Sequence, residues 1–339
     1  MVSPRFQGPA EKLGNVSTLP GIEIPDAIRD GEASLARLVA SIPLGSTALI
    51  DTEFRLPGIG DKPIRASFIE SSELALGRDE GRHEPRFGQM ILNGAGLHER
   101  PILVAIKPFN ASTDNHPDIL LRREWGTSNY LNSLSDRQLT YIPLGIWRTK
   151  EGVNNLITLY EHDVKSYDNV FWADRDLSPE ALREQTVEHA LSDCIRGLGY
   201  LHGLGLAHTD AEAKNLAANF SGVRFIDLEG VRHLPQKDNA VTESKTTINL
   251  IRNDIETLFD STIQVDENRS AIAPVLAKSS IDYNLAKIYL SGIRQASVDG
   301  GIKMPDLPTT SPEYFKNTID HTLKIASSPS PRSNQAPVH

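Results

Sequence analysis

The stretch His208-Thr209-Asp210-Ala211-Glu212-Ala213-Lys214-Asn215 carries the residues that decide the fold of this 339-residue chain. Asp210 follows His208 by two positions and precedes Asn215 by five. Helical periodicity before the stretch and strand-like residues after it predict a loop between a long helix and a short strand. A further carboxylate, Asp227, closes the next strand-like run.

Asp210, Asn215 and Asp227 form a set of oxygen-bearing side chains that suits phosphoryl transfer. This reaction needs a carboxylate that orients the attacking hydroxyl and accepts its proton, and oxygen ligands that hold Mg²⁺ against the nucleotide phosphates. Strand-like runs at residues 216–220 and 223–228 predict a hairpin. Because a hairpin returns to the same edge of a sheet, we expect Asn215 and Asp227 to share one metal site.

The spacing His-x-Asp-x-x-x-x-Asn, followed by a hydrophobic-Asp dipeptide, resembles the catalytic and metal-binding loops of the protein-kinase-like superfamily. The resemblance implies that Asp210 is the catalytic base and that Asn215 and Asp227 bind Mg²⁺. It further implies that ATP and Mg²⁺ are the cofactors and that His208 supports the loop. Asp254 resembles the buried aspartate that braces the catalytic loop of kinases, a structural role.

The same resemblance predicts a lysine on the third strand of a small lobe, and Val104-Ala105-Ile106-Lys107 matches that pattern letter by letter. In such enzymes the lysine holds the α- and β-phosphates, and a glutamate from the next helix holds the lysine. Glu124 is placed for that role, although a surface glutamate that pairs along its own helix would give the same pattern. Lys107 and Glu124 are the expected nucleotide-binding pair.

Hydrophobic periodicity predicts the elements around these residues. Alternating apolar residues predict strands at residues 66–76, 87–92, 102–109, 141–147 and 155–161, of which the first three suggest an antiparallel meander. Helical spacing recurs at residues 118–134, 178–201, 246–263 and 281–293. We therefore expect an α+β, two-lobed protein-kinase-like fold, with a small antiparallel sheet and one helix in the first lobe and a mainly helical second lobe.

This layout divides the chain into four parts. We expect an N-terminal extension at residues 1–63, a small ATP-binding lobe at 64–162, a helical catalytic lobe at 163–325 and a disordered, Ser/Pro-rich tail at 326–339.

Two loops depart from the conventional kinase pattern. Residues 77–88 lack Gly-x-Gly-x-x-Gly, so Arg78, Arg82 and Arg86 are alternative phosphate contacts, unless the segment is only a charged hairpin end. Asp227-Leu228-Glu229 replaces Asp-Phe-Gly. The segment after it is short and lacks Ala-Pro-Glu, which argues against activation-loop control.

The acceptor-side residues also depart from that pattern. Glu212 stands two positions after the base, where serine/threonine kinases usually have a lysine, and Lys214 lies close by as a candidate phosphate contact. These departures resemble those of atypical bacterial branches, such as aminoglycoside phosphotransferases and lipopolysaccharide-core kinases.

We favour an atypical Ser/Thr protein kinase that transfers the γ-phosphate of ATP to a hydroxyl acceptor. A sugar, aminoglycoside or lipopolysaccharide-type kinase, and a non-catalytic kinase-like binding module, stay open.

The bulk composition bears on partners and compartment. The formal net charge of -9 argues against a nucleic-acid binder. The sequence contains no apolar run long enough to span a bilayer, and its single cysteine, Cys194, rules out a disulfide framework. We expect a cytoplasmic protein without a membrane span. The chain contains neither His-Glu-x-x-His nor Gly-x-Ser-x-Gly, the motifs of zinc proteases and serine hydrolases.

Overall fold

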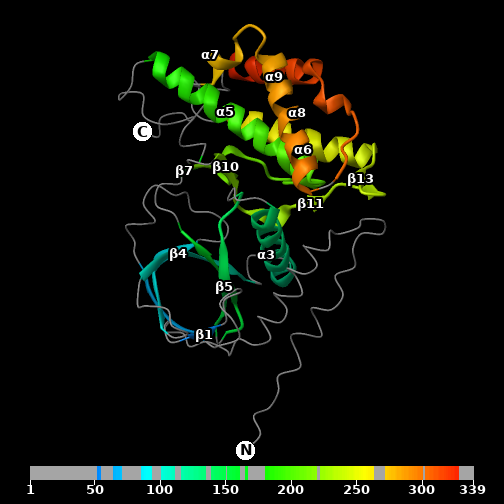
Figure 1. Ribbon diagram of the computed structural model, residues 1–339. Helices are drawn as coiled ribbons and strands as arrows, with labels where there is room; N and C mark the ends of the chain where they lie inside the picture. The colour runs from blue at the N-terminus through cyan, green and yellow to red at the C-terminus, as the bar shows by residue number, and fades with distance from the viewer. Residues whose placement is uncertain are drawn as a thin grey trace, which may run out of the picture. The chain divides into compact units, whose positions relative to one another are not determined.

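The computed structural model describes residues 52–54, 64–70, 85–93, 101–110, 116–134, 139–149, 151–160, 165–166, 180–219, 222–262, 272–300 and 302–327. The expected extension and tail lie outside this set, apart from residues 52–54 and 326–327. The chain divides into two compact units (Figure 1). The first unit is Met1–Val164 with Phe225–Val231, and the second is Lys165–Arg224 with Arg232–His339.

The first unit contains an antiparallel sheet whose strands run in the order β1-β2-β3-β4-β6-β5. The expected meander is confirmed for β2 to β4. The short strand β1, which pairs with β2, was not predicted. The strands are β1 (Thr52–Phe54), β2 (Ile64–Glu70), β3 (Arg86–Asn93), β4 (Pro101–Phe109), β5 (Pro143–Arg148) and β6 (Asn154–Leu159).

Helix α3 (Pro117–Leu134) belongs to the same unit and shares its hydrophobic core. Leu121 and Trp125 of α3 join Val104, Ile106 and Leu156 of the sheet in one buried cluster. Burial of side chains of this size stabilises a fold by about 1.5–3 kcal/mol each. The core therefore fixes the position of α3 against β4, the strand that carries Lys107.

The end of β10 (Gly222–Phe225) enters the first unit as well. Phe225 donates its backbone N–H to Leu139 O at 2.8 Å. The strand predicted at residues 223–228 is shorter than expected, because Asp227 has left-handed backbone angles (φ 61, ψ 51) that no strand residue adopts. A single 3₁₀ turn, η3 (Leu228–Gly230), follows.

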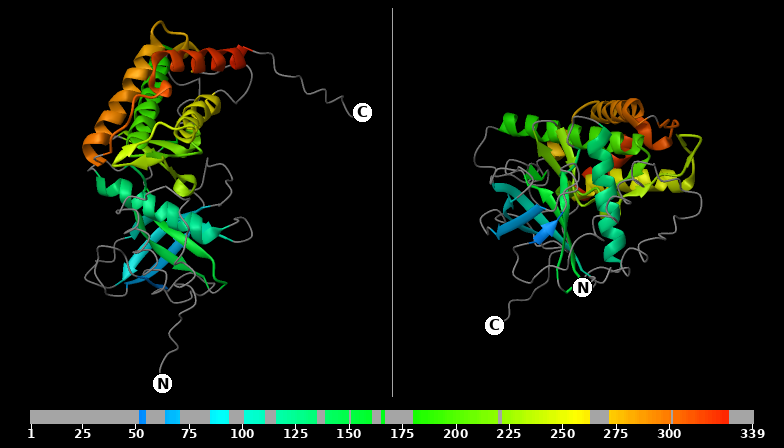
Figure 2. Two further views of the ribbon diagram at one scale, coloured as in Figure 1. Left: turned by 90° about the vertical axis from the view of Figure 1, so that its right-hand side faces the viewer. Right: turned by 60° about the horizontal axis from the view of Figure 1, so that its bottom comes forward.

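The second unit is mainly helical. Figure 2 shows α5 (Glu180–Gly203), in green, and α8 (Ile281–Gly300), in orange, lying side by side. Their backbones approach closely, because a Cβ on Gly199 would lie 2.2 Å from Tyr289 O and one on Gly292 would lie 2.2 Å from Arg196 O. The remaining helical elements are α6 (Lys245–Ser261), α7 (Ala273–Leu276), η4 (Pro308–Thr310) and α9 (Pro312–Ser327).

Short strands connect the helices of the second unit. β7 (Lys165–Ser166), β9 (Leu216–Asn219) and β10 form a sheet in the order β10-β9-β7, so the two strands expected to form a hairpin are hydrogen-bonded neighbours. β8 (Leu206–Ala207) pairs with β11 (Arg232–His233), and β12 (Gln236–Lys237) pairs with β13 (Ala240–Val241).

The observed architecture is a mixed α/β fold with a small antiparallel sheet and several helices, as the periodicity predicted. In the part of the chain that the structure describes, no helix combines the length and the apolar character that crossing a membrane requires.

Candidate active site

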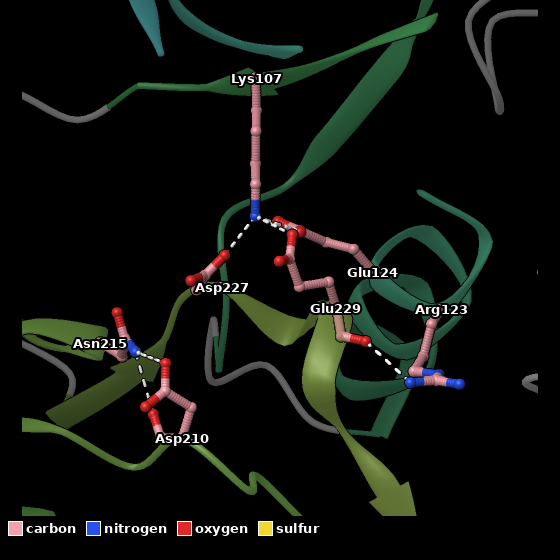
Figure 3. Close-up of polar contacts among 7 residues, drawn as sticks. All are labelled: Lys107, Arg123, Glu124, Asp210, Asn215, Asp227 and Glu229. Atoms are coloured by element: carbon pink, nitrogen blue, oxygen red, sulfur yellow. Dashed lines mark hydrogen bonds and ion pairs between the residues drawn. The ribbon is translucent and has the colours of Figure 1, made fainter. Parts of the chain in front are cut away.

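Lys107 and Glu124 are in direct contact in the first unit (Figure 3). Lys107 Nζ, on β4, donates a hydrogen bond to Glu124 Oε2, on α3, at 2.6 Å. The two side chains are only 15% and 10% exposed. The structure thus brings together the two residues expected to form the nucleotide-binding pair, whereas their function stays a prediction.

Two further carboxylates, both from the turn after β10, contact the same ammonium group (Figure 3). Lys107 Nζ donates to Asp227 Oδ1 and lies 2.9 Å from Glu229 Oε2. The backbone of this turn is tied to α3, because Arg123 Nη1 donates to Glu229 O at 3.1 Å. The sequence analysis noted Glu229 only as a departure from the Asp-Phe-Gly pattern. The feature that could have indicated this contact is its acidic side chain two positions after Asp227.

The electrostatics of this cluster follow from its composition. Burial opposes protonation of Lys107, but the carboxylates of Glu124, Asp227 and Glu229 outweigh it and raise the pKa of the ammonium above its ordinary value. Burial raises the pKa of Glu124 to about 7, although Lys107 acts in the opposite direction. With all groups ionised, three carboxylates around one ammonium leave a surplus of two negative charges, which favours a divalent cation.

The donor set of the cluster fits Mg²⁺. Glu124, Asp227 and Glu229 each offer one carboxylate oxygen, and these oxygens lie within 4.8 Å of one another. Mg²⁺ prefers oxygen ligands and is commonly held by one or two protein carboxylates together with phosphate oxygens. Asp227 and Glu229 come from one turn and are suited to hold the metal, while Glu124 is buried against Lys107.

The loop after β8 holds Asp210 and Asn215 in the second unit. Asn215 lies in the 3₁₀ turn η2 (Ala213–Asn215), and its Nδ2 donates both to Asp210 O and to Asp210 Oδ2, each at 2.9 Å (Figure 3). The amide therefore orients the Asp210 carboxylate through two contacts. Asn215 is buried and Asp210 is half-buried, so the amide is enclosed by the protein while the residue that it orients stays partly exposed.

Asp254, on α6, braces the start of this loop. Its Oδ2 accepts from His208 N and its Oδ1 accepts from Thr209 N, both at 2.7 Å. Asn253 Nδ2 adds a bond to Thr209 O at 3.3 Å. Thr209 needs this support, because its φ of 67° is unfavourable for a β-branched residue. The expected structural role of Asp254 is confirmed.

A buried chain of polar groups continues behind Asp254. His202 Nε2 lies 2.9 Å from Asp254 Oδ2, and His202 Nδ1 lies 2.6 Å from the Tyr289 hydroxyl. With Asp254 ionised, Nε2 carries the proton toward it, and Nδ1 of a neutral ring accepts from Tyr289. Sequence reasoning did not find this network, because its members lie on three helices far apart in the chain.

The segment that follows the η3 turn is short and folded. β12 and β13 form a tight hairpin around Asp238 and Asn239, whose φ angles of 52° and 55° suit a type I′ turn. The Thr242 hydroxyl donates to Pro235 O, and the Ser244 hydroxyl caps α6 by accepting from Thr247 N. The expectation that this segment provides no activation-loop control stays a prediction.

The other expected contact residues have varied surroundings. Lys214 Nζ forms a largely exposed ion pair with Glu212 Oε2 at 2.6 Å. The Arg86 guanidinium lies 5.3 Å from the centre of the Trp147 ring, and Arg78 and Arg82 fall outside the described residues. Asp227 belongs to the first unit and Asn215 to the second, so the metal site that they were expected to share stays a prediction.

Comparisons with known proteins add little to this geometry. Neither a family model nor a curated protein matches the chain. Among 764 matching chains of solved structures is one described as WaaP in complex with acyl carrier protein. It covers 74% of this chain and 88% of its own, with 12% identity and a TM-score of 0.36. Superposition of this quality supports no inference about function.

Proposed function

We propose that the protein is an ATP- and Mg²⁺-dependent phosphotransferase with a protein-kinase-like fold, acting on a hydroxyl acceptor. The observation that carries this proposal is the contact of Lys107 with Glu124 and Asp227. Kinases bind the nucleotide phosphates with a lysine that a helix glutamate holds in place, next to an aspartate that binds the metal. Asp210, oriented by Asn215, supplies the second half of the chemistry.

Each residue has a defined task in the proposed reaction. Lys107 binds phosphate oxygens while Glu124 keeps its ammonium in place, and Asp227 with Asn215 would hold Mg²⁺. When bound, the metal neutralises charge that develops on the transferred phosphoryl group. Asp210 orients the acceptor hydroxyl and accepts its proton as the oxygen attacks phosphorus. Asp254 keeps the loop that carries Asp210 in its strained conformation.

The acceptor is proposed to be a protein serine or threonine in an atypical kinase reaction. A small hydroxylated molecule is the second candidate, because the segment at residues 232–244 is short, contains the β12–β13 hairpin, and has its Thr242 and Ser244 hydroxyls bonded to nearby backbone. Such a short segment provides little surface for binding an extended peptide substrate. Transfer of labelled phosphate in a cell extract, separated into protein and metabolite fractions, distinguishes the two acceptor classes.

The proposed activity is tested with purified protein, Mg²⁺ and γ-labelled ATP. We expect ATP turnover or autophosphorylation that Asp210→Ala and Asp227→Ala each abolish. Asp320→Ala, an exposed position on α9, is the matched control and should retain full activity. If the wild-type protein binds no nucleotide, it is a non-catalytic relative or another kind of protein, and unchanged turnover in both variants would rule out the assigned site.

A further inference from the structure

Lys107 is surrounded by carboxylates of its own chain. Its Nζ donates hydrogen bonds to Glu124 and Asp227, and Glu229 Oε2 lies 2.9 Å away as a third, ion-paired carboxylate. Phosphate oxygens that approach Nζ therefore meet like charge close to the ammonium, and close contact requires that one of these carboxylates withdraws. If Lys107 binds nucleotide, as the proposed function requires, then in the described conformation carboxylates of the chain itself occupy the position of the nucleotide phosphates.

The three carboxylates are not equivalent. Glu124 belongs to α3, whose position the hydrophobic core fixes, and it lies 2.6 Å from Nζ, whereas Glu229 lies at 2.9 Å. Asp227 and Glu229 share the η3 turn, whose backbone Arg123 ties to α3 through Glu229 O. The Glu229 side chain can thus leave Lys107 by rotating about its own bonds, while the backbone stays in place.

A carboxylate that leaves Lys107 needs another cation. The Glu229 side chain is only 12% exposed, so its charge is poorly hydrated and must remain paired. The nearest alternative is a divalent cation held together with Asp227, since the oxygens of both residues lie within 4.8 Å of each other. Withdrawal of Glu229 from Lys107 and binding of a divalent cation then favour one another.

We infer that Glu229 gates nucleotide binding: its carboxylate occupies Lys107 in the metal-free protein and moves to the divalent cation when the nucleotide phosphates take its place on the lysine. This inference rests on the proposed function and adds a residue to the phosphate-binding site. A divalent cation would then raise nucleotide affinity in two ways. It neutralises charge on ATP, and it also draws the competing Glu229 carboxylate away from Lys107.

The test is binding of a fluorescent ATP analogue to the full chain, in EDTA and in saturating Mg²⁺. We expect Glu229→Gln to tighten binding in EDTA on the order of tenfold, the factor that corresponds to loss of one competing charge-assisted contact. Binding in Mg²⁺ should not tighten, because there the carboxylate has already left the lysine. Glu188→Gln, which alters an exposed ion pair with Lys278, is the matched control and should change neither value.

A second variant separates contact from bulk charge. Glu229→Asp keeps the charge but is one methylene shorter, so it should also tighten binding in EDTA. If only the Gln variant tightens binding, the effect is long-range electrostatics and the inference is wrong. Unchanged or weaker binding of both variants in EDTA also overturns it. Should Glu229→Gln fail to fold, the Asp variant decides alone, and a wild-type protein that binds no nucleotide in either condition refutes the proposed function together with this inference.

Discussion

Lys107 Nζ lies 2.6 Å from Glu124 Oε2, although 17 positions separate the two residues along the chain. The contact joins β4 to α3 across a core in which Trp125, next to Glu124, is completely buried. Because the flanking apolar residues fix both backbones, the ion pair is preorganised rather than formed when a ligand arrives. A preorganised cation loses little conformational entropy on binding phosphate.

Lys107→Met should therefore weaken nucleotide binding strongly. The variant removes the ammonium that contacts Glu124, Asp227 and Glu229, so we expect the Kd for ATP with Mg²⁺ to rise about 10- to 100-fold. Isothermal titration calorimetry measures the change. Lys278→Met is a suitable control, since Lys278 pairs with Glu184 and Glu188 at a separate site where the three side chains are 34–41% exposed. Equal affinities for the Lys107 variant and the wild type would contradict a role of Lys107 in phosphate binding.

The raised pKa of Glu124 predicts a pH-dependent stability. Between its ordinary value of 4.5 and its folded value of about 7, the folded protein binds more protons at this site than the unfolded chain. The contribution of Glu124 to the free energy of unfolding therefore falls as the pH rises through this window. We expect the free energy of unfolding, measured with urea, to fall more between about pH 5 and about pH 8 for the wild type than for Glu124→Gln.

The comparison of slopes isolates Glu124 from the other titrating groups, which are common to both proteins. Glu188→Gln should keep the wild-type slope, because the side chain of this glutamate is 41% exposed and is therefore well hydrated. Identical slopes for wild type and Glu124→Gln would show that burial does not perturb this carboxyl.

The sequence predicted best those elements whose periodicity is locally complete. β3, β4, α3, α5, α6 and α8 lie where alternating or helical spacing placed them, to within a few residues at most ends. Helix α9 was not predicted, because the buried face that contains Phe315 and Ile319 also contains the polar residues Thr318 and Thr322, which interrupt its apolar pattern. Its side chains are buried by neighbours that only the folded chain supplies.

For the candidate site, motif spacing identified residues but not their contacts. The spacing predicted Lys107, Glu124 and Asp254, and the structure shows the first two in contact and the third, on α6, hydrogen-bonded to the loop that carries Asp210. It could not show that Glu229 reaches Lys107, since that contact depends on the left-handed turn at Asp227 and the position of α3. Pairing between distant segments is a property of the packed core, not of local spacing.

The close approach of α5 and α8 makes Gly199 sensitive to substitution. The Cβ of Gly199→Ala would lie 2.2 Å from Tyr289 O, a backbone atom that cannot move without shifting α8. We expect a loss of about 2 kcal/mol or more in unfolding free energy, which lowers the Tm by roughly 4–8 °C. Differential scanning calorimetry measures it, with Ser291→Ala on the exposed face of α8 as the control. An unchanged Tm would mean that the two helices are not packed this closely.

Asp254→Asn should damage the loop that carries Asp210 more than the surroundings of Lys107. The aspartate accepts from His208 N, Thr209 N and His202 Nε2, whereas an asparagine has one amide oxygen and would present NH₂ to at least one of these donors. We expect a loss of about 2–4 kcal/mol of stability and a fall in kcat for phosphate transfer, while the affinity of Lys107 for nucleotide stays within about twofold. Denaturant unfolding, single-turnover transfer and nucleotide titration separate the three effects. Asp320→Asn, exposed on α9, should alter none of them. A variant that keeps its kcat despite lower stability would show that the strained backbone of Thr209 does not depend on Asp254 for its conformation.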